Sequence, residues 1–227
     1  MPGGESELYN TIARLSIPGG CSDLSCSRGP PVVTFPAMTS RMVLLRHGAT
    51  EWSEAGRHTG RSDIPLLGEG RDQAKVAGQM LQGFQFALVL TSPLRRAAET
   101  CELAGFDGEP EPDLMEWDYG SYEGLTSDEI REGHPGWTLW TDGVEGGERA
   151  ADVGRRADRV IERARAVEGD TLCVAHGHIL RVLAARWLGL PPAGGRVLAL
   201  HPAAISVLGW ERDTPVVMRW NVSGELG

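Results

Sequence analysis

The amino-acid sequence predicts an α/β fold, a three-layer α/β/α sandwich around a mainly parallel sheet. Three short apolar runs, at 42–45, 87–90 and 171–175, each stop at a small or polar segment. A helical pattern follows each of them, and strands that alternate with helices pack as a parallel sheet with helices on both faces. In such sheets ligands bind beyond the carboxyl ends of the strands, so those ends are where function is expected.

The first strand–helix unit begins where the composition changes near Arg41. The apolar run 42–45 ends in Arg46-His47-Gly48. A helical pattern then extends from about Gly70 to Leu81. The sequence therefore predicts a strand, a loop that carries polar side chains, and a helix.

The second and third units repeat this order. The run 87–90 stops at Thr91-Ser92-Pro93, where Ser92 is predicted to cap a helix whose first residue is Pro93. The run 171–175 leads into a helix at 179–188.

The remaining elements are predicted from periodicity and capping. Apolar residues recur at helical spacing from Val153 to Val167, and this amphipathic helix is predicted to end near Gly169. Its arginines are predicted to form the solvated face: Arg155, Arg156, Arg159 and Arg163. Thr126 and Glu129 form a capping-box signature of another short helix. The C-terminal part is predicted to contain strands at 197–200, 205–210 and 216–220.

The N-terminal residues 1–40 differ from the rest because they are rich in glycine, proline and serine. They are predicted to be a mobile extension, followed by one domain at 41–227. Leu8, Ile12 and Leu15 have helical spacing, so a short docking helix is the alternative. Met38 precedes the first strand, which also allows a start-site extension.

Composition narrows the class of partner. A net charge of -9 and a pI of about 5.2 disfavour nucleic acid and anionic membranes. No apolar run approaches the roughly 18 residues that span a bilayer, and no secretory signal is predicted. The four cysteines have no paired spacing, which fits a reducing compartment, so a cytoplasmic location is predicted. Lys75 is the single lysine, so an anion pocket would have to use arginine and histidine.

Cationic side chains follow all three predicted strands. Arg46 and His47 follow the first strand, Arg96 lies one helical turn after the second, and His176 precedes Gly177 after the third. Arginine forks bind two phosphate oxygens at once, and glycine lets the backbone approach an anion closely. The convergence predicts a phosphate pocket.

A reaction is predicted from the same residues. The neutral imidazole of His47 can attack phosphorus and form a covalent intermediate. Glu116 lies among apolar and aromatic neighbours, where a carboxyl group suits the role of general acid, and Asp118 is the competing candidate. A metal site is an alternative interpretation of the pair His176 and His178. However, a strand end that turns into a helix would not keep both rings on one face. No metal and no cofactor are therefore predicted.

Five segments of the chain resemble one known family. Arg46–Trp52, Thr59-Gly60, Ser92–Ala97, Glu116 before Tyr119-Gly120, and Ala175-His176-Gly177 are similar to the histidine phosphatase superfamily, the clan of cofactor-dependent phosphoglycerate mutases. The resemblance runs from about Arg41 to the C-terminus.

This resemblance implies a phosphoglycerate mutase-like fold and a metal-free reaction. It implies that His47 is the phosphorylated histidine and that Glu116 is the proton donor. The implied phosphate pocket consists of Arg46, Arg96, His176 and Gly177. A substrate loop is expected to include Ser53, Thr59 and Gly60.

Departures from the mutases favour transfer to water. Mutases carry a lysine and two arginines after the acid-bearing segment, whereas 121–140 here contains no lysine and only Arg131. His178 stands where mutases have asparagine. The chain looks closest to bacterial acid phosphatases that are often mislabelled as mutases, and it is also similar to the sedoheptulose-bisphosphatase branch. Gly147-Glu148-Arg149 replaces the family's usual Gly-Glu-Ser.

The predicted function is therefore a metal-independent histidine acid phosphatase that hydrolyses small phosphate esters through a phosphohistidine intermediate. The alternatives are a cofactor-dependent phosphoglycerate mutase, a sedoheptulose-bisphosphatase-like sugar phosphatase, and a silent phospholigand-binding module. The expected partner is a small phosphorylated metabolite. Family likeness also predicts a homodimer.

Overall fold

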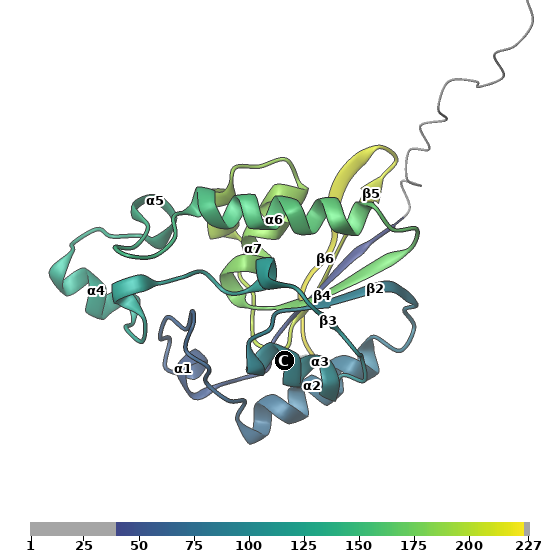
Figure 1. Cartoon of the computed structure of the whole chain (residues 1–227), viewed down its shortest axis with the longest axis horizontal. Helices are drawn as coiled ribbons and strands as arrows, with labels where there is room; N and C mark the ends of the chain where they lie inside the picture. Colours follow the sequence, from purple (N-terminus) through teal and green to yellow (C-terminus); the bar gives the residue numbers. More distant parts are fainter. Residues whose placement is uncertain (1–39, 225–227) are drawn as a thin grey trace, which may run out of the picture. The chain divides into compact units, whose positions relative to one another are not determined.

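The computed structural model describes residues 40–224 and contains a six-stranded sheet (Figure 1). The strand order is β3-β2-β4-β1-β5-β6. The first four of these strands are parallel to one another, and β5 is antiparallel to both of its neighbours, β1 and β6. The predicted mainly parallel sheet is therefore confirmed. The strand bounds are β1 Met42–Arg46, β2 Phe86–Thr91, β3 Glu109–Pro110, β4 Asp170–Ala175, β5 Ile205–Glu211 and β6 Thr214–Val222.

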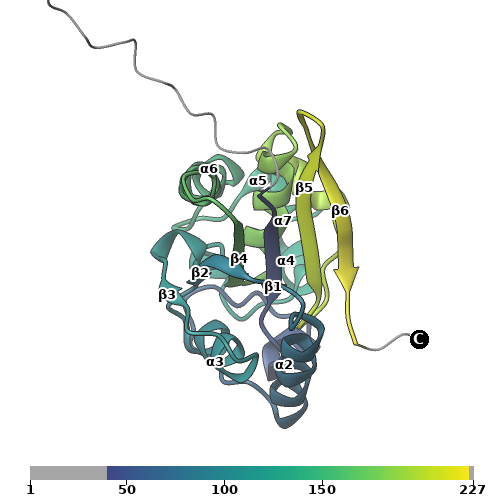
Figure 2. The same cartoon turned by 90° about the vertical axis from the view of Figure 1, so that its right-hand side faces the viewer.

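Helices cover both faces of the sheet, which confirms the three-layer sandwich (Figure 2). Alternate residues of β1 explain the two layers, because successive side chains of a strand point to opposite faces. Met42 and Leu44 pack into the core beneath α6 and α7, whereas Val43 and Leu45 pack into the core beneath α2 and α3. The four helices are α2 Gly68–Met80, α3 Arg95–Leu103, α6 Ala150–Arg165 and α7 Gly177–Trp187.

Short elements connect the layers. The predicted capping box is confirmed, since the Thr126 hydroxyl accepts the Glu129 N–H at 3.2 Å and the Glu129 carboxylate accepts the Thr126 N–H at 2.7 Å. The short helices are α1 Glu51–Glu54, α4 Ser127–Gly133 and α5 Leu139–Asp142, and the 3-10 turns are η1 Pro112–Leu114, η2 Gly120–Tyr122 and η3 Pro192–Val197.

The predicted helix cap at Ser92 is wrong. Helix α3 begins at Arg95, and the Arg95 N–H donates to the Asp63 carboxylate at 3.0 Å. Ser92 lies before the helix because its hydroxyl, 2.7 Å from the ring of His176, is part of the strand-end cluster described below.

The predicted strand at 197–200 is also wrong. Both edges of β5 are already paired, with β1 and with β6, and the segment forms no ladder with the outer edge of β6. The segment instead leaves the 3-10 turn at Val197 and offers backbone carbonyls to side chains. Leu200 O accepts from Arg46, and Ala199 O accepts from the Trp220 indole.

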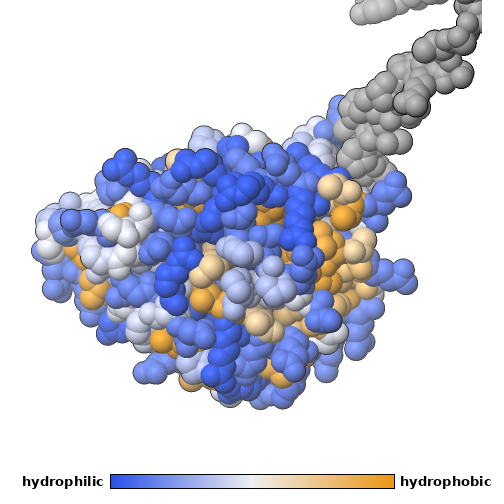
Figure 3. All heavy atoms as spheres, in the orientation of Figure 1, coloured by the Kyte–Doolittle hydropathy of each residue, from blue (hydrophilic) through white to orange (hydrophobic). Residues whose placement is uncertain are grey.

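The predicted N-terminal extension lies outside the described residues, as does the docking helix considered for it. The division into 1–40 and 41–227 therefore stays a prediction. Between residues 40 and 224, no helix combines the length and apolarity that crossing a bilayer requires. The face drawn in Figure 3 is mostly hydrophilic, with apolar side chains in small groups.

Candidate active site

The carboxyl ends of β1, β2 and β4 meet at one edge of the sheet and bring together four side chains, here called the strand-end cluster: Arg46, His47, Ser92 and His176. The ring centroids of His47 and His176 are 5.1 Å apart. Arg96, from the first turn of α3, reaches the same place, with its Nε 3.1 Å from the His176 Nδ1. The predicted convergence of strand ends is thus present in the structure.

His47 is a neutral imidazole with one ring nitrogen free. Its Nδ1 lies 2.8 Å from the Gly48 carbonyl, so Nδ1 carries the hydrogen and donates it. No residue between 40 and 224 forms a hydrogen bond with Nε2. Burial, followed by the charges of Arg46 and Arg96, holds the pKa of His47 well below its usual value. The lone pair on Nε2 is therefore available to an electrophile.

Arg46, which lines the same cavity as His47, has a donor without a partner. Its Nη1 donates to the Leu200 carbonyl at 2.5 Å, but its buried Nε has no acceptor within the described part of the chain. A Cβ added to Gly177 would lie 3.5 Å from the Arg46 Cζ and 3.7 Å from the Glu116 Oε2. Gly177 therefore leaves the space between the guanidinium and the carboxylate open.

Arg96 is fully buried, and four of its five N–H groups are already used. Nε donates to His176, Nη1 donates to the Ser62 carbonyl at 2.8 Å, and Nη2 donates to the carbonyls of Thr59 and Gly60, each at 3.0 Å. The predicted loop residues Thr59 and Gly60 thus contact Arg96 through their backbone. One N–H of Arg96 remains for an anion.

His176 also lies behind His47 rather than on the open surface of the cavity. Because its Nδ1 accepts from Arg96, a neutral ring carries its hydrogen on Nε2, which lies 2.7 Å from the Ser92 Oγ. Burial, together with the charge of Arg96, lowers the pKa of His176 well below its usual value and keeps the ring neutral. The sequence analysis missed Ser92 here, although its position directly after a strand was the available signal.

Glu116 is held at the N-terminus of α7. Its Oε2 accepts the backbone N–H of His178 at 2.9 Å, and its Oε1 accepts those of Ile179 at 2.9 Å and Trp117 at 3.0 Å. These donors and the positive end of the helix dipole fix both oxygens of a carboxyl group that is only 5% exposed. Oε1 thus accepts two hydrogen bonds and Oε2 accepts one, so Oε2 keeps a second lone pair.

The competing candidate, Asp118, faces elsewhere. One of its oxygens lies 3.3 Å from the Arg61 Nε, and the other accepts the Gly120 N–H at 3.0 Å. Asp118 is not among the residues that line the cavity, whereas Glu116 is. The geometry therefore favours Glu116 as the carboxyl group next to His47.

A cavity of about 260 Å³ opens over these groups. Of the predicted residues, it is lined by Arg46, His47, Ser53, Thr59, Glu116 and Gly177. Arg96, His176 and Gly60 lie behind its wall. Six further polar residues, which were not predicted as site residues, also line it: Arg57, His58, Tyr119, Ser127, His178 and Arg181.

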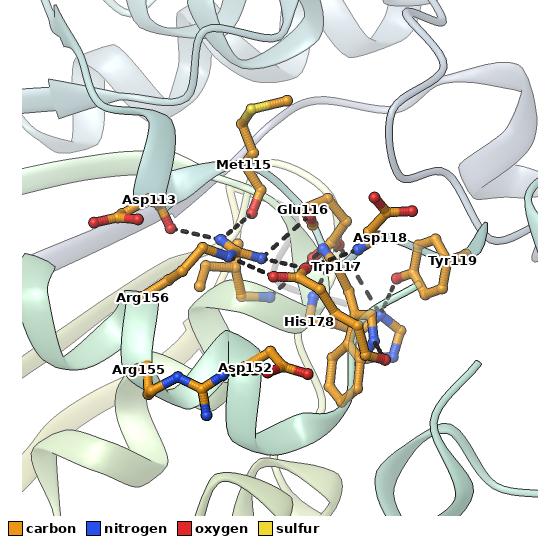
Figure 4. Close-up of polar contacts among 12 residues, drawn as sticks. Asp113, Met115, Glu116, Trp117, Asp118, Tyr119, Asp152, Arg155, Arg156 and His178 are labelled. Carbon is orange, nitrogen blue, oxygen red and sulfur yellow. Dashed lines mark hydrogen bonds and ion pairs between the residues drawn. The ribbon is translucent and has the colours of Figure 1, made fainter. Parts of the chain in front are cut away.

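Besides His47, two histidines line the cavity, His58 and His178, and both are neutral. The Tyr119 hydroxyl lies 2.7 Å from the His178 Nδ1 (Figure 4). Burial keeps the pKa of His178 well below its usual value and raises that of Tyr119 well above, so the hydroxyl donates to the ring. Burial also lowers the pKa of His58 to about 4. His176 and His178 thus have separate partners, Ser92 and Arg96 for one and Tyr119 for the other.

Comparison with known proteins assigns the family. Residues 42–223 match the histidine phosphatase superfamily (branch 1). An acid phosphatase of Mycobacterium tuberculosis is 45% identical over 176 residues, which cover 75% of this chain and 87% of the relative. A sedoheptulose 1,7-bisphosphatase of Saccharomyces cerevisiae is 35% identical over 190 residues, which cover 69% of this chain and 70% of the relative.

Solved structures agree with the sequence comparisons. The structure of a functionally characterised open reading frame of Mycobacterium tuberculosis superposes with a TM-score of 0.79 at 41% identity, covering 82% of this chain and 99% of the other. The predicted phosphoglycerate mutase-like fold and the predicted phosphatase activity are confirmed by these similarities. The chain belongs to the histidine phosphatase superfamily and is a phosphatase of that family.

Proposed function

We propose that this protein hydrolyses small phosphate monoesters in two steps, through a phosphoryl group carried on His47. The observation that carries the proposal is that one cavity is lined by a neutral His47 with a free Nε2 and by Arg46 with an unpartnered Nε. A nucleophile with a free lone pair and a donor for the phosphoryl oxygens are the two parts that covalent phosphoryl transfer needs.

In the first step the Nε2 lone pair of His47 forms a bond to phosphorus while the ester P–O bond breaks. The leaving alkoxide takes a proton from the carboxyl group of Glu116. In the second step Glu116 accepts a proton from water, whose oxygen attacks the phosphorus of phospho-His47. The P–N bond breaks, inorganic phosphate leaves, and His47 is neutral again.

In this proposal Arg46 and the backbone at Gly177 bind the phosphoryl oxygens, and Arg96 and His176 support them from behind the cavity wall. The attraction between the arginine charges and the phosphoryl oxygens is stronger in this site than in water, because little solvent screens it. Ser53, in α1, and Thr59, in the loop after it, line the cavity and contribute to substrate choice in this proposal, and Gly60 supports them through Arg96.

We propose a small phosphorylated metabolite as substrate, since a cavity of about 260 Å³ holds a phosphoryl group and a short carbon chain. Relatives include an acid phosphatase and a sedoheptulose 1,7-bisphosphatase, which supports this class. A cytoplasmic location is supported by the two buried thiols, Cys101 and Cys173, which are unpaired. Homodimerisation is supported by family likeness alone and stays a prediction.

Trapping the intermediate tests the proposal. Rapid alkaline quenching during turnover of nitrophenyl phosphate is expected to leave an acid-labile phosphoryl group on the peptide that contains His47. H47A is expected to lose this group and at least about 10⁴-fold in turnover. H134A, which changes an exposed histidine, is the matched control. A label on another peptide, or retained turnover in H47A, would remove His47 from the mechanism.

Two further measurements separate the alternatives. A chelator is expected to leave turnover unchanged, because arginines supply the charge that a metal would otherwise provide. Conversion of 3-phosphoglycerate that depends on 2,3-bisphosphoglycerate and exceeds ester hydrolysis would favour the mutase. Phosphate binding without hydrolysis of any ester would favour a silent binding module.

A further inference from the structure

Arg156, in the middle of α6, is a largely buried arginine whose five N–H groups all have acceptors (Figure 4). Sequence analysis placed it on the solvated face of the helix, and this is wrong. Its side chain is 12% exposed, whereas that of Arg155 is 66% exposed. Nη1 donates to the carbonyls of Asp113 at 2.7 Å and Met115 at 2.8 Å, and Nη2 contacts the carbonyl of Glu116 at 3.4 Å.

Glu148 contacts both Arg156 and the segment that contains Glu116. Its carboxylate accepts a two-pronged interaction from Arg156, with both N–O distances at 2.8 Å. The same carboxylate accepts the Asp118 N–H at 3.0 Å. The Glu148 backbone donates to the Asp118 carbonyl at 2.9 Å and accepts the Trp117 indole N–H at 2.8 Å. Arg156 and Glu148 therefore bind the segment 113–118 on both sides of Glu116.

The segment 113–118 has little regular structure to hold it. Turn η1 ends at Leu114 and turn η2 begins at Gly120, so Glu116 belongs to no helix or strand. Its carbonyl contacts Arg156, and its carboxylate contacts the first N–H groups of α7. Side chains, rather than a backbone ladder, thus set where this carboxyl group lies.

We propose that Arg156, with Glu148, is the positioning pair for the proton-donating Glu116, and this inference rests on the proposed function. Neither residue lines the cavity, so both act through Glu116 rather than on substrate. Arginine is required because only a planar fork can bind a carboxylate with two N–H groups and still reach three carbonyls. Lysine keeps the charge but has three donors on one nitrogen.

The test is the dependence of kcat/KM on the leaving group, from nitrophenyl phosphate to glycerol phosphate. This constant reports steps through the first loss of the leaving group, in which only a basic alkoxide needs the proton of Glu116. R156K is expected to lose about 10- to 100-fold on glycerol phosphate, since misplacement by about 1 Å costs up to about 100-fold. The loss on nitrophenyl phosphate is expected to stay below about 3-fold.

A double-mutant cycle with E116Q separates positioning from a general structural role. If Arg156 acts through Glu116, then R156K adds less than about 3-fold to the loss already present in E116Q. Additive losses, or equal losses on both substrates, would overturn the inference. If E116Q itself shows no dependence on the leaving group, the acid assignment in the proposed function fails instead.

Two variants guard against misfolding. Lysine at 156 keeps Glu148 from becoming an unpaired buried charge, which would be strongly destabilising. In E148Q/R156M both charges are removed together, and the new amide oxygen can still accept the Asp118 N–H. This double variant is expected to show the same dependence on the leaving group as R156K. R155Q, which loses only an exposed pair with Asp152, is the control and is expected to match the wild type on both substrates.

Discussion

Two parts of the active site are positioned by different means. The strand-end cluster stands on the ends of three neighbouring strands, so the backbone hydrogen bonds of the sheet set its spacing. Glu116 lies in a segment without regular structure. This segment is bound by the ion pair between Arg156 of α6 and Glu148, which lies in the loop before α6. Positions set by a sheet follow from topology, whereas positions set by side-chain contacts depend on each contributing residue.

The comparison predicts different kinds of damage. Changes near the strand ends are expected to lower activity on all esters alike, or to unfold the protein. Changes around Glu116 are expected to alter how activity depends on the leaving group. The predictions below test this division.

Among changes around Glu116, the largest effect is expected for E116Q. Its kcat/KM for alkyl phosphates is expected to fall by about 10²- to 10⁴-fold, because the leaving alkoxide loses its proton donor, and the fall for nitrophenyl phosphate is expected to be much smaller. Steady-state kinetics on both substrates measure this. D118N should stay within about 3-fold of the wild type, since Asp118 pairs with Arg61 instead. A larger effect in D118N would move the acid role to Asp118.

Two glycines that follow strands, Gly48 and Gly177, are expected to differ in how much an alanine substitution lowers the free energy of unfolding. A Cβ on Gly48 would lie 2.1 Å from the Gly70 carbonyl oxygen in α2, whereas one on Gly177 would meet the Arg46 side chain at 3.5 Å. G48A is expected to lower the free energy of unfolding by about 3 kcal/mol or more, because backbone atoms would have to move. G177A is expected to cost less than about 1 kcal/mol. Urea unfolding of both proteins decides, and equal costs would contradict this account of the close approach.

The third prediction concerns acid stability near Glu116. Burial, with a further contribution from the charge of Arg131 and opposition from Glu123, lowers the pKa of His58 to about 4. Between pH 6.5 and about 4 the unfolded chain therefore binds a proton that the folded protein does not. The free energy of unfolding falls as pH falls through this window, by up to about 3 kcal/mol from this residue.

H58Q removes that contribution and is expected to reduce the slope of stability against pH. Urea unfolding at pH 7 and at pH 4.5 measures the slope in each protein. The other buried histidines have shifts of the same sign, so part of the slope remains. An unchanged slope in H58Q would show that His58 takes up its proton in the folded protein as well.

The smallest effect is expected for S92A. This change removes the hydrogen-bond partner of the His176 Nε2 and an acceptor for the Leu94 N–H. A loss of about tenfold in kcat/KM is expected on every ester, in line with one buried hydrogen bond of about 1.4 kcal/mol. T126A, at the cap of α4, serves as a control for general loss of stability. If the loss in S92A depended on the leaving group, the division between the two parts of the site would not hold.

Sequence analysis placed the strand-end cluster well because its logic is topological. An apolar run that stops at Arg46-His47 or at His176 predicts both a strand and the polar side chains at its carboxyl end. The sequence-based prediction was wrong where a polar side chain had two possible partners. Ser92 can cap a helix or contact a ring, and the choice depends on His176, which lies 84 positions further along the chain.

Arg156 shows the same limit more strongly. On α6 it is one arginine among several, and periodicity alone gave no reason to separate it from Arg155. Its burial follows from the segment 113–118 passing over that point of the helix. The strand expected at 197–200 failed for a related reason, since tertiary contacts decide whether the segment pairs with a strand or offers its carbonyls to side chains.

The sequence by itself determined the layered α/β fold, the family and the set of groups for phosphoryl transfer, because periodicity and strand-end motifs are local properties of the chain. Only the tertiary structure decided which carboxyl group faces His47, which arginine is buried behind it and which histidine nitrogen is free. Those outcomes are set by contacts between residues far apart in the chain, whose partners become defined when the helices pack on the sheet.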